Sequence, residues 1–152
     1  MRASVTVHVD APPLRVFELV SDITKMGEYS PEVVQAEWLD GATGPAVGVR
    51  YRGQVRRNES WPVLYWTTCE ITACVPGEVF EFTVLAGDTV VNTWRYDFVA
   101  ADGGTDVTES FHLPDNFLTK LWRPFGGFLR ERRNARDMQR TLERVREVAE
   151  RA

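Results

Sequence analysis

Six segments rich in strand-forming residues follow one another between positions 33 and 113, and most of them end at a turn signal. They cover residues 33–39, 48–57, 63–75, 79–85, 89–100 and 105–113, with pairs such as Asp-Gly, Pro-Gly and Gly-Asp between them. Strands separated in this way are typical of an antiparallel meander. Such a sheet needs another element to cover its apolar face, and this requirement limits the possible folds.

The flanking regions supply a seventh strand and the covering element. Val5, Val7 and Val9 alternate with polar residues, which predicts a half-buried strand. The prolines after Asp10 mark the start of a short helix, and residues 22–29 can add one or two turns before the next proline. Apolar residues then recur at helical spacing from 118 to 148, interrupted near 124–127 by proline and glycine. The part after residue 127 would span roughly 36 Å as a helix.

The predicted order is therefore strand, two short helices, six strands and a long C-terminal helix. We expect one α+β domain over residues 1–152, because neither a linker nor a repeat interrupts this order. A strongly curved sheet cannot close tightly along the whole length of one helix. We therefore expect a cavity between the sheet and the C-terminal helix.

Composition and charge are those of a soluble globular chain. Of 152 residues, 43% are hydrophobic and 26% charged, and the net charge is −4. Residues 117–152 carry 10 Lys and Arg against 5 Asp and Glu. A basic segment can contact nucleic acid or a membrane surface, but opposite charges four residues apart favour a solvated helix face. Without basic and aromatic residues interleaved on the strands, we expect no nucleic-acid partner. No apolar run approaches the length of a membrane span, and no signal peptide is evident, so we expect a cytoplasmic protein.

The two cysteines, Cys69 and Cys74, lie on one predicted strand. An odd spacing puts them on opposite faces, roughly 16 Å apart, which is too far for a disulfide. Neither a Cys-x-x-Cys pair nor a histidine cluster is present. We therefore expect no metal site and no cofactor.

The histidines and the glycine-rich segment argue against two kinds of chemistry. His8 and His112 share the parity of polar neighbours, so both are expected to face outward, and no Ser-His-Asp or Cys-His set can be built. Gly41, Gly44 and Gly48 precede a strand rather than a helix N-terminus, so they do not form a phosphate cradle. That segment is expected to be a turn or a flexible lid over the cavity.

Six short blocks in this order resemble a known family. They are residues 9–12 (Val-Asp-Ala-Pro), 26–31 (Met-Gly-Glu-Tyr-Ser-Pro), 38–42 (Trp-Leu-Asp-Gly-Ala), 66–71 (Trp-Thr-Thr-Cys-Glu-Ile), 94–98 (Trp-Arg-Tyr-Asp-Phe) and 104–110 (Gly-Thr-Asp-Val-Thr-Glu-Ser). Over nearly its whole length the chain resembles the START/SRPBCC superfamily, and within it the polyketide cyclase/dehydrase group common in actinobacteria. The resemblance implies the helix-grip fold shared with the birch pollen allergen, here with a seven-stranded sheet. It also implies a hydrophobic cavity for lipids, sterols or polyketides, but no particular reaction.

Strand parity and the helical stripe suggest which side chains line the cavity. Apolar positions mark the inner face of each strand, and the helix presents its apolar side to that face. For each aromatic residue the alternative is plain core packing, although a buried tyrosine hydroxyl usually seeks a partner. The candidate ligand-binding residues are Tyr51, Thr67, Cys69, Phe80, Phe82, Trp94, Tyr96, Glu109, Phe111, Phe125, Phe128, Leu129 and Arg132.

One carboxylate falls on the predicted inner face. Glu109 lies between Val107 and Phe111, and a buried charge is costly unless it is paired. Arg132 occupies a helix position where the stripe calls for an apolar residue, so the two side chains could form a pair inside the cavity. Alternatively, a bulge turns Glu109 outward, or Arg132 extends to solvent.

Three functions fit these observations. The first is a binding module for a small hydrophobic, lipid-like or polyketide-like molecule, with its polar groups orienting the ligand. The second is an aromatase/cyclase-type enzyme in which Glu109 or a tyrosine moves protons, so the sequence leaves enzymatic activity open. The third is a toxin- or stress-type interaction protein that acts through its basic helix. The chain could be a monomer or a homodimer.

Overall fold

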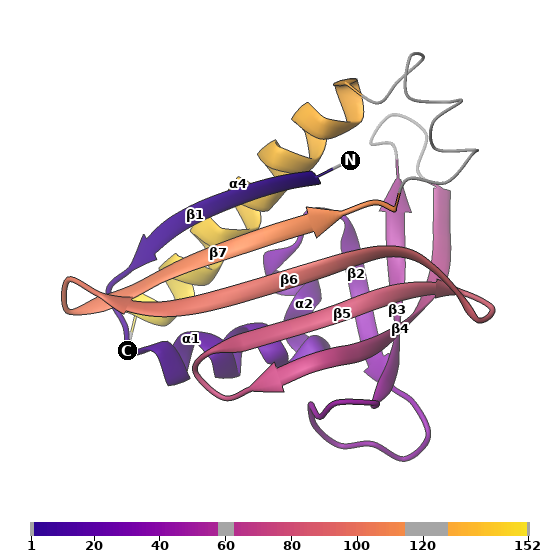
Figure 1. The fold of residues 1–152 in the computed structure, drawn as a ribbon, viewed down its shortest axis with the longest axis horizontal. Helices are drawn as coiled ribbons and strands as arrows, with labels where there is room; N and C mark the ends of the chain where they lie inside the picture. Colours follow the sequence, from indigo (N-terminus) through magenta and orange to yellow (C-terminus); the bar gives the residue numbers. More distant parts are fainter. Residues whose placement is uncertain (1, 58–62, 115–127, 152) are drawn as a thin grey trace.

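Seven antiparallel strands form the sheet of this computed structural model, in the order β1-β7-β6-β5-β4-β3-β2 (Figure 1). The structure describes residues 2–57, 63–114 and 128–151, and of residues 57, 63 and 128–134 it describes the backbone alone. The strands are β1 (Arg2–Val9), β2 (Val33–Trp38), β3 (Arg50–Arg57), β4 (Val63–Val75), β5 (Val79–Ala86), β6 (Thr89–Ala101) and β7 (Gly104–His112). The predicted meander is confirmed, because each of the strands β2 to β6 pairs with the strand that follows it in sequence. The first strand, β1, pairs with β7 and forms the edge of the sheet opposite to β2.

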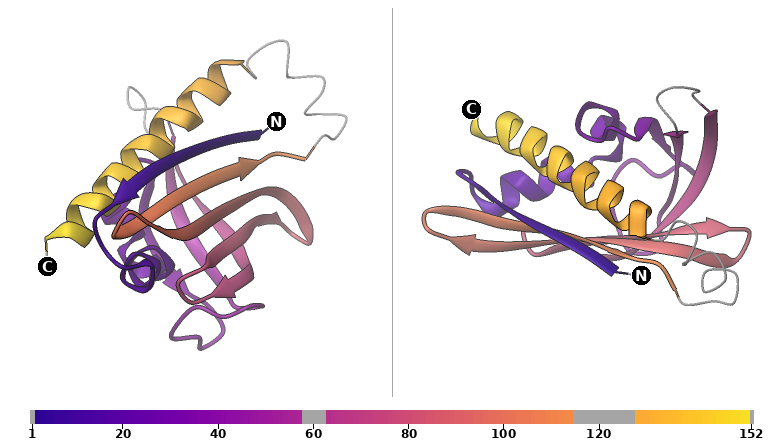
Figure 2. Two further views of the ribbon diagram at one scale, coloured as in Figure 1. Left: turned by 60° about the vertical axis from the view of Figure 1, so that its left-hand side comes forward. Right: turned by 90° about the horizontal axis from the view of Figure 1, so that it is seen from above.

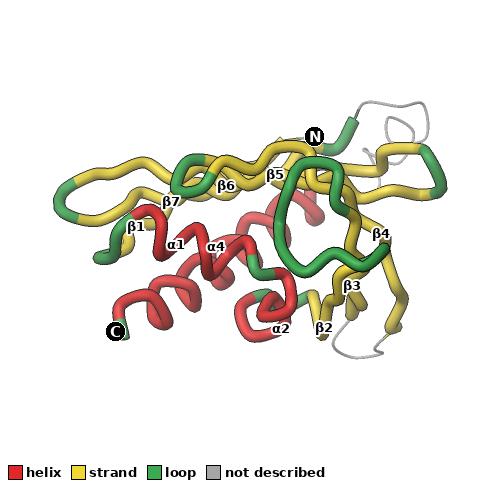
Figure 3. The backbone as a smooth tube through the Cα atoms, turned by 90° about the horizontal axis from the view of Figure 1, so that it is seen from below, coloured by secondary structure: helices red, strands yellow, loops and turns green. Residues whose placement is uncertain are grey.

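The helices all cover one face of the sheet, as Figures 2 and 3 show. They are α1 (Pro13–Ser21), the short 3-10 helix η1 (Ile23–Lys25), α2 (Met26–Tyr29) and the long α4 (Phe128–Glu150). Proline in the first turn of α1 suits a helix start, because its missing N–H has no partner there in any helix. The predicted breaks at Pro124 and the Gly126-Gly127 pair lie outside the described residues.

A buried apolar stripe holds α4 against the sheet. Met138, Leu142, Val145 and Ala149 recur at three- and four-residue spacing, and each is at most 2% exposed. This spacing puts the four side chains on one helix face, so the predicted stripe is confirmed over this part of the helix. In the part of the chain that the structure describes, no helix has the length and apolarity that a membrane crossing requires.

The sheet curves strongly, so that β2 and β3 run crosswise to β1 and β7 (Figure 1). Register shifts occur between Ile71 and Ala73 in β4, between Val84 and Leu85 in β5, and near Val34 in β2. A bulge adds one residue to one strand, bends that strand and increases its twist. These bulges explain how one sheet can curve around α4.

The bulge in β4 corrects the expectation for the cysteines. Cys69 is buried on the inner face, and beyond the bulge Cys74 is paired with the buried Phe80 and packs against the same core. The extra residue shifts the alternation, so the two cysteines share a face instead of lying on opposite faces. Both carry free thiols, so the prediction of no disulfide between them is confirmed.

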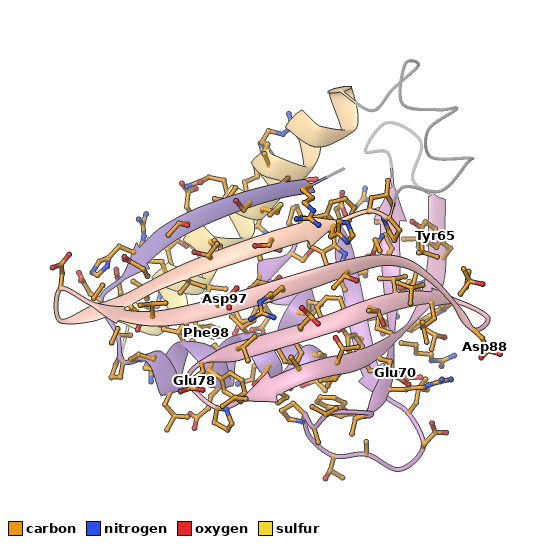
Figure 4. All side chains as sticks on the ribbon, viewed as in Figure 1. Tyr65, Glu70, Glu78, Asp88, Asp97 and Phe98 are labelled. Atoms are coloured by element: carbon orange, nitrogen blue, oxygen red, sulfur yellow. The ribbon has the colours of Figure 1, made fainter. Side chains whose placement is uncertain are left out.

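Side chains alternate between the two faces along the paired strands. Figure 4 labels Asp97 and Phe98, which are neighbours on β6. Phe98 is buried against Phe17 of α1, whereas Asp97 pairs with Arg95 on the outer face. His8 also lies on the outer face, between the buried Val7 and Val9, as its parity predicted.

Candidate ligand cavity

A cavity of about 110 Å³ lies between the inner face of the sheet, α2 and α4. It is mostly apolar, with a minority of polar side chains. Half-exposed residues, among them Pro31, Glu32 and Asp137, mark where it reaches the surface. Its lining consists of Val20, Met26, Tyr29, Ser30, Pro31, Glu32, Val33, Tyr51, Gly53, Val55, Thr67, Cys69, Phe82, Val84, Trp94, Tyr96, Glu109, Asp137, Met138, Thr141 and Val145.

Glu109 faces the cavity from the centre of β7. It is 3% exposed, and its register with both β1 and β6 is continuous, so no bulge turns it outward. Tyr96 lies directly opposite on β6, and its hydroxyl donates a hydrogen bond of 2.8 Å to Glu109 Oε1. The other carboxyl oxygen, Oε2, is buried and has no hydrogen-bond partner among the described residues.

Burial determines the charge of Glu109. Loss of solvent raises the pKa of Glu109 from 4.5 to about 8, with a smaller upward contribution from the negative charge of Glu32. The hydrogen bond from Tyr96 acts in the opposite direction and lowers the pKa of Glu109. The side chain is therefore mainly a neutral carboxylic acid at neutral pH. Because Oε1 already accepts a hydrogen bond from Tyr96, the proton belongs on Oε2.

A second polar group comes from the paired strands β3 and β4. Tyr51 lies opposite Cys69, and its hydroxyl is buried without a hydrogen-bond partner of acceptable geometry among the described residues. Burial raises the pKa of Tyr51 well above 10, and the nearby Cys69 thiol raises it further. Burial also raises the pKa of Cys69 to about 11, so its thiol is neutral and unreactive near neutral pH.

Gly53 gives the cavity part of its space. It lies on the inner face between Tyr51 and Val55 and is itself buried. A Cβ at this position would meet its nearest atoms at 3.9 Å, which is ordinary van der Waals contact. The backbone therefore accepts a larger residue here, and the missing side chain leaves the space to the cavity.

The segment from α2 to β2 forms the wall opposite the sheet. Tyr29 is 3% exposed, and its hydroxyl has no partner among the described residues. Gly27 allows α2 to lie directly on β2, because a Cβ there would collide with the carbonyl oxygen of Val34. This close approach positions Tyr29 over the cavity.

Residues 30–33 form the rim of the cavity, and hydrogen bonds to backbone groups hold this segment in place. Ser30 Oγ accepts from the N–H groups of Glu32 and Val33, each at 3.2 Å. The Glu32 carbonyl accepts from the N–H of Arg56 at 2.7 Å. The rim is therefore held by hydrogen bonds within its own segment and by one hydrogen bond to β3.

The structure brings seven of the candidate residues together around the cavity: Tyr51, Thr67, Cys69, Phe82, Trp94, Tyr96 and Glu109. Two other candidates are buried but are not part of the lining. Phe80 packs against the rings of Phe82 and Tyr96, and Phe111 packs against Trp94 at a ring distance of 4.6 Å. Both support lining side chains from the surrounding core.

Four helix candidates are not placed at the side-chain level. Phe125 lies outside the described residues, and Phe128, Leu129 and Arg132 belong to the stretch where the backbone alone is described. A pairing of Glu109 with Arg132 therefore stays a prediction.

Other lining residues were missed, although the sequence contained a signal for some of them. Gly53, Val55 and Val84 have inner-face parity, and Met138 and Val145 belong to the helical stripe. Residues 29–33 carried no periodic signal in the sequence, because their position at the cavity results from the packing of α2 on β2.

Gly41, Gly44 and Gly48 lie in the loop before β3 and are not among the lining residues, which favours a turn over a cavity lid. In the described ranges, no three His, Cys, Asp or Glu side chains are grouped as metal ligands would be.

A curved antiparallel sheet that grips a C-terminal helix, with an apolar cavity between them, defines the helix-grip class of ligand-cavity proteins. The chain belongs to the family of polyketide cyclases/dehydrases and lipid transport proteins, whose family model matches residues 1–150. This family is part of the START/SRPBCC superfamily, as the sequence blocks indicated. No curated protein sequence matches the chain significantly.

Solved structures share the fold at low sequence identity. The protein CV1439 of Chromobacterium violaceum superposes with a TM-score of 0.73 at 15% identity, covering 99% of this chain and 98% of its own. The Polyketide_cyc-like protein Cgl2372 of Corynebacterium glutamicum has a TM-score of 0.60 at 26% identity, covering 98% and 91%. The di-domain ARO/CYC protein BexL of the BE-7585A biosynthetic pathway has a TM-score of 0.73 at 21% identity, covering 100% of this chain and 50% of BexL.

Proposed function

We propose that this protein binds a small hydrophobic ligand in the cavity, with a polar end of the ligand at Tyr96 and Glu109. The supporting observation is that three buried polar groups at one apolar cavity have no hydrogen-bond partner of acceptable geometry among the described residues: the Tyr29 hydroxyl, the Tyr51 hydroxyl and Glu109 Oε2. Each buried polar atom without a partner costs about 1–3 kcal/mol. Three such groups around one cavity are expected where a ligand supplies the missing hydrogen bonds.

The size of the cavity limits the part of the ligand that is enclosed. A volume of about 110 Å³ is close to that of the apolar cavity of ~150 Å³ that takes up one benzene molecule. One ring, or the end of a longer chain, would therefore be enclosed. The rest of a lipid-like or polyketide-like molecule would pass out between the rim and α4.

A cavity-filling variant tests this function. In Gly53→Ile, the new side chain would occupy the cavity, while the β-branched residue suits a strand. Wild type and variant would be purified without denaturation, and their organic extracts compared by mass spectrometry. We expect an apolar compound to co-purify with wild type and to be absent or strongly reduced in the variant.

Gly44→Ala is the matched control for the added side chain. Gly44 has no atom within 4 Å of a Cβ and does not line the cavity. This variant should retain the compound. Equal recovery from all three proteins, or no apolar compound from any of them, would count against the proposed function.

A second candidate function is that of an aromatase/cyclase-type enzyme. The observation that favours it is the neutral acid of Glu109 beside Tyr96, because a carboxylic acid with its pKa near neutrality can give and take protons. The fold shared with BexL supports this candidate. Turnover of a poly-ketone by wild type and its loss in Glu109→Gln would support it, whereas full turnover by the variant would exclude the carboxyl as the proton donor.

A further inference from the structure

The described cavity lining contains carboxyl groups but no basic side chain. Glu32, Glu109 and Asp137 line the cavity, and no lysine, arginine or histidine is among the lining residues that the structure describes. An anionic group placed among these described residues would lose its hydration without gaining an opposite charge from any of them. The described part of the lining is therefore unfavourable for carboxylate or phosphate groups.

The buried polar groups that have no partner among the described residues can donate hydrogen bonds. The hydroxyls of Tyr29 and Tyr51 each carry a proton, and burial raises the pKa of both above 10. Glu109 uses Oε1 to accept from Tyr96, which leaves Oε2 to carry its own proton toward the cavity. A buried carboxylic acid kept neutral in this way acts as a hydrogen-bond donor.

We propose that the cavity is a donor site for an uncharged ligand with a carbonyl-type oxygen, at which Glu109 donates through Oε2, and that it rejects carboxylates. This inference rests on the ligand-binding function proposed above and specifies the chemical class of the ligand. A carbonyl oxygen has two lone pairs and accepts from Glu109 together with one tyrosine hydroxyl. Deprotonation of Glu109 removes the donor and adds a buried negative charge beside the ligand oxygen.

Binding of such a ligand must then depend on pH in one direction. The described titratable groups that line the cavity together with Glu109 come from several elements: Tyr96 on β6, Tyr51 on β3, Cys69 on β4, Tyr29 on α2, Glu32 in the rim and Asp137 on α4. Tyr51, Tyr96 and Cys69 keep their protons past pH 9, because burial raises the pKa of each of them. Glu109 is the group among them with its pKa at about 8, so affinity falls as the pH rises through that value.

Four ring probes of similar size separate the possible ligand classes. Acetophenone offers a carbonyl oxygen, cumene replaces it with carbon, benzoate adds a negative charge, and phenethylammonium adds a positive charge. Dissociation constants would be measured by NMR titration of the intact protein at about pH 6 and about pH 9. We expect acetophenone to bind about tenfold more tightly than cumene or benzoate at the lower pH. We expect its affinity to fall by about tenfold at the higher pH, following the protonated fraction of Glu109.

Variants identify the carboxyl as the source of the pH dependence. Glu109→Gln keeps a donor at the position of Oε2 but cannot titrate, so its affinity for acetophenone should be the same at both pH values. Glu18→Gln makes the same chemical change at an exposed position of α1 and should keep the pH dependence of wild type.

The outcomes distinguish this inference from the proposed function. Benzoate or cumene binding as tightly as acetophenone would overturn the donor site while leaving ligand binding intact. Preferential binding of phenethylammonium that strengthens with pH would do the same and would identify an amine site. If none of the probes binds and Gly53→Ile also has no effect on co-purifying compounds, the ligand-binding function itself fails.

Discussion

Tyr96 and Glu109 lie directly opposite each other on β6 and β7, and the tyrosine hydroxyl donates to Oε1 of the buried carboxyl over 2.8 Å. This bond uses one oxygen of Glu109 and leaves the other buried without a described partner. The bond thus fixes the orientation of the acid and leaves its second oxygen without a partner among the described residues.

Removal of the Tyr96 hydroxyl tests its effect on the Glu109 carboxyl. In Tyr96→Phe, the pKa of Glu109 should rise above about 8, because the hydrogen bond from Tyr96 lowers it in wild type. The free energy of unfolding should fall by about 1–3 kcal/mol, because Oε1 loses its partner inside the protein. A titration of the Glu109 carboxyl carbon by ¹³C NMR, together with denaturant unfolding, measures both effects. An unchanged or lower pKa would contradict the role given to this bond.

Tyr51→Phe should behave differently, although it deletes the same atom from another lining tyrosine. Among the described residues, the Tyr51 hydroxyl has no hydrogen-bond partner of acceptable geometry, so its removal should leave the ligand-free protein as stable as before or more stable by about 1 kcal/mol. Affinity for an oxygen-bearing probe such as acetophenone should fall. Denaturant unfolding and NMR titration of the same samples check the two effects. A clear loss of stability would show that the hydroxyl already has a partner.

Glu109 should also make the stability of the protein depend on pH. Burial raises its folded-state pKa to about 8 from an ordinary value of 4.5, so the folded protein holds this proton more tightly than the unfolded chain does. The contribution to stability is therefore full below pH 4.5 and is lost as the pH rises toward about 8. The expected slope in this window is about 1.4 kcal/mol per pH unit.

Glu109→Gln should remove this slope. Relative to wild type, the variant should gain stability steadily between about pH 5 and about pH 8, because the glutamine amide stays neutral throughout. Denaturant unfolding at several pH values measures the difference. A difference that stays constant with pH would mean that the carboxyl has an ordinary pKa in the folded protein.

Gly27→Ala should disturb the wall of the cavity. The new Cβ would collide with the Val34 carbonyl oxygen, so α2 must move away from β2. We expect a loss of about 1–3 kcal/mol in unfolding free energy and weaker binding of the ring probes. Gly44→Ala adds the same methyl group where nothing lies within 4 Å and should have little effect. Equal stability of the two variants would show that α2 has room to shift.

His8 offers a separate test on the outer face of the sheet. Its Nδ1 lies 2.8 Å from Asp106 and its Nε2 lies 3.1 Å from Asp10, so both ring nitrogens can donate when the ring is protonated. Asp106 is the main cause of the raised pKa of His8, and Asp10 adds to it. The stabilisation is therefore present below the ordinary pKa of 6.5 and is lost as the pH rises through the folded-state value. In Asp106→Asn, NMR titration of the His8 ring should show a lower pKa, and an unchanged value would contradict the pairing.

Strand alternation predicted much of the fold and part of the cavity. It placed Glu109 on the inner face, and the placement holds because β7 pairs on both sides without a register shift. The same reasoning was wrong for Cys74, because a bulge between Ile71 and Ala73 adds one residue to the count. Parity is reliable only between bulges, and a bulge leaves little trace in a single sequence.

The rest of the cavity depends on contacts between elements far apart in space. Tyr29 and Glu32 reach the cavity because α2 packs on β2 at Gly27. No periodic pattern in the sequence predicts that contact. Phe80 and Phe111 have inner-face parity but pack against other rings of the core. Parity can tell which face a side chain occupies, but it cannot tell whether the space beyond that side chain is filled.

The tethered rim has a kinetic consequence. Ser30 and the Arg56 N–H hold residues 30–33 at several backbone positions, so this segment needs little ordering when a ligand arrives. A preformed entrance lowers the entropic cost of association, and related ligands then enter such a site at similar rates. Differences in affinity among ring compounds should therefore reside in their dissociation rates, with residence time rather than speed of capture separating one ligand from another.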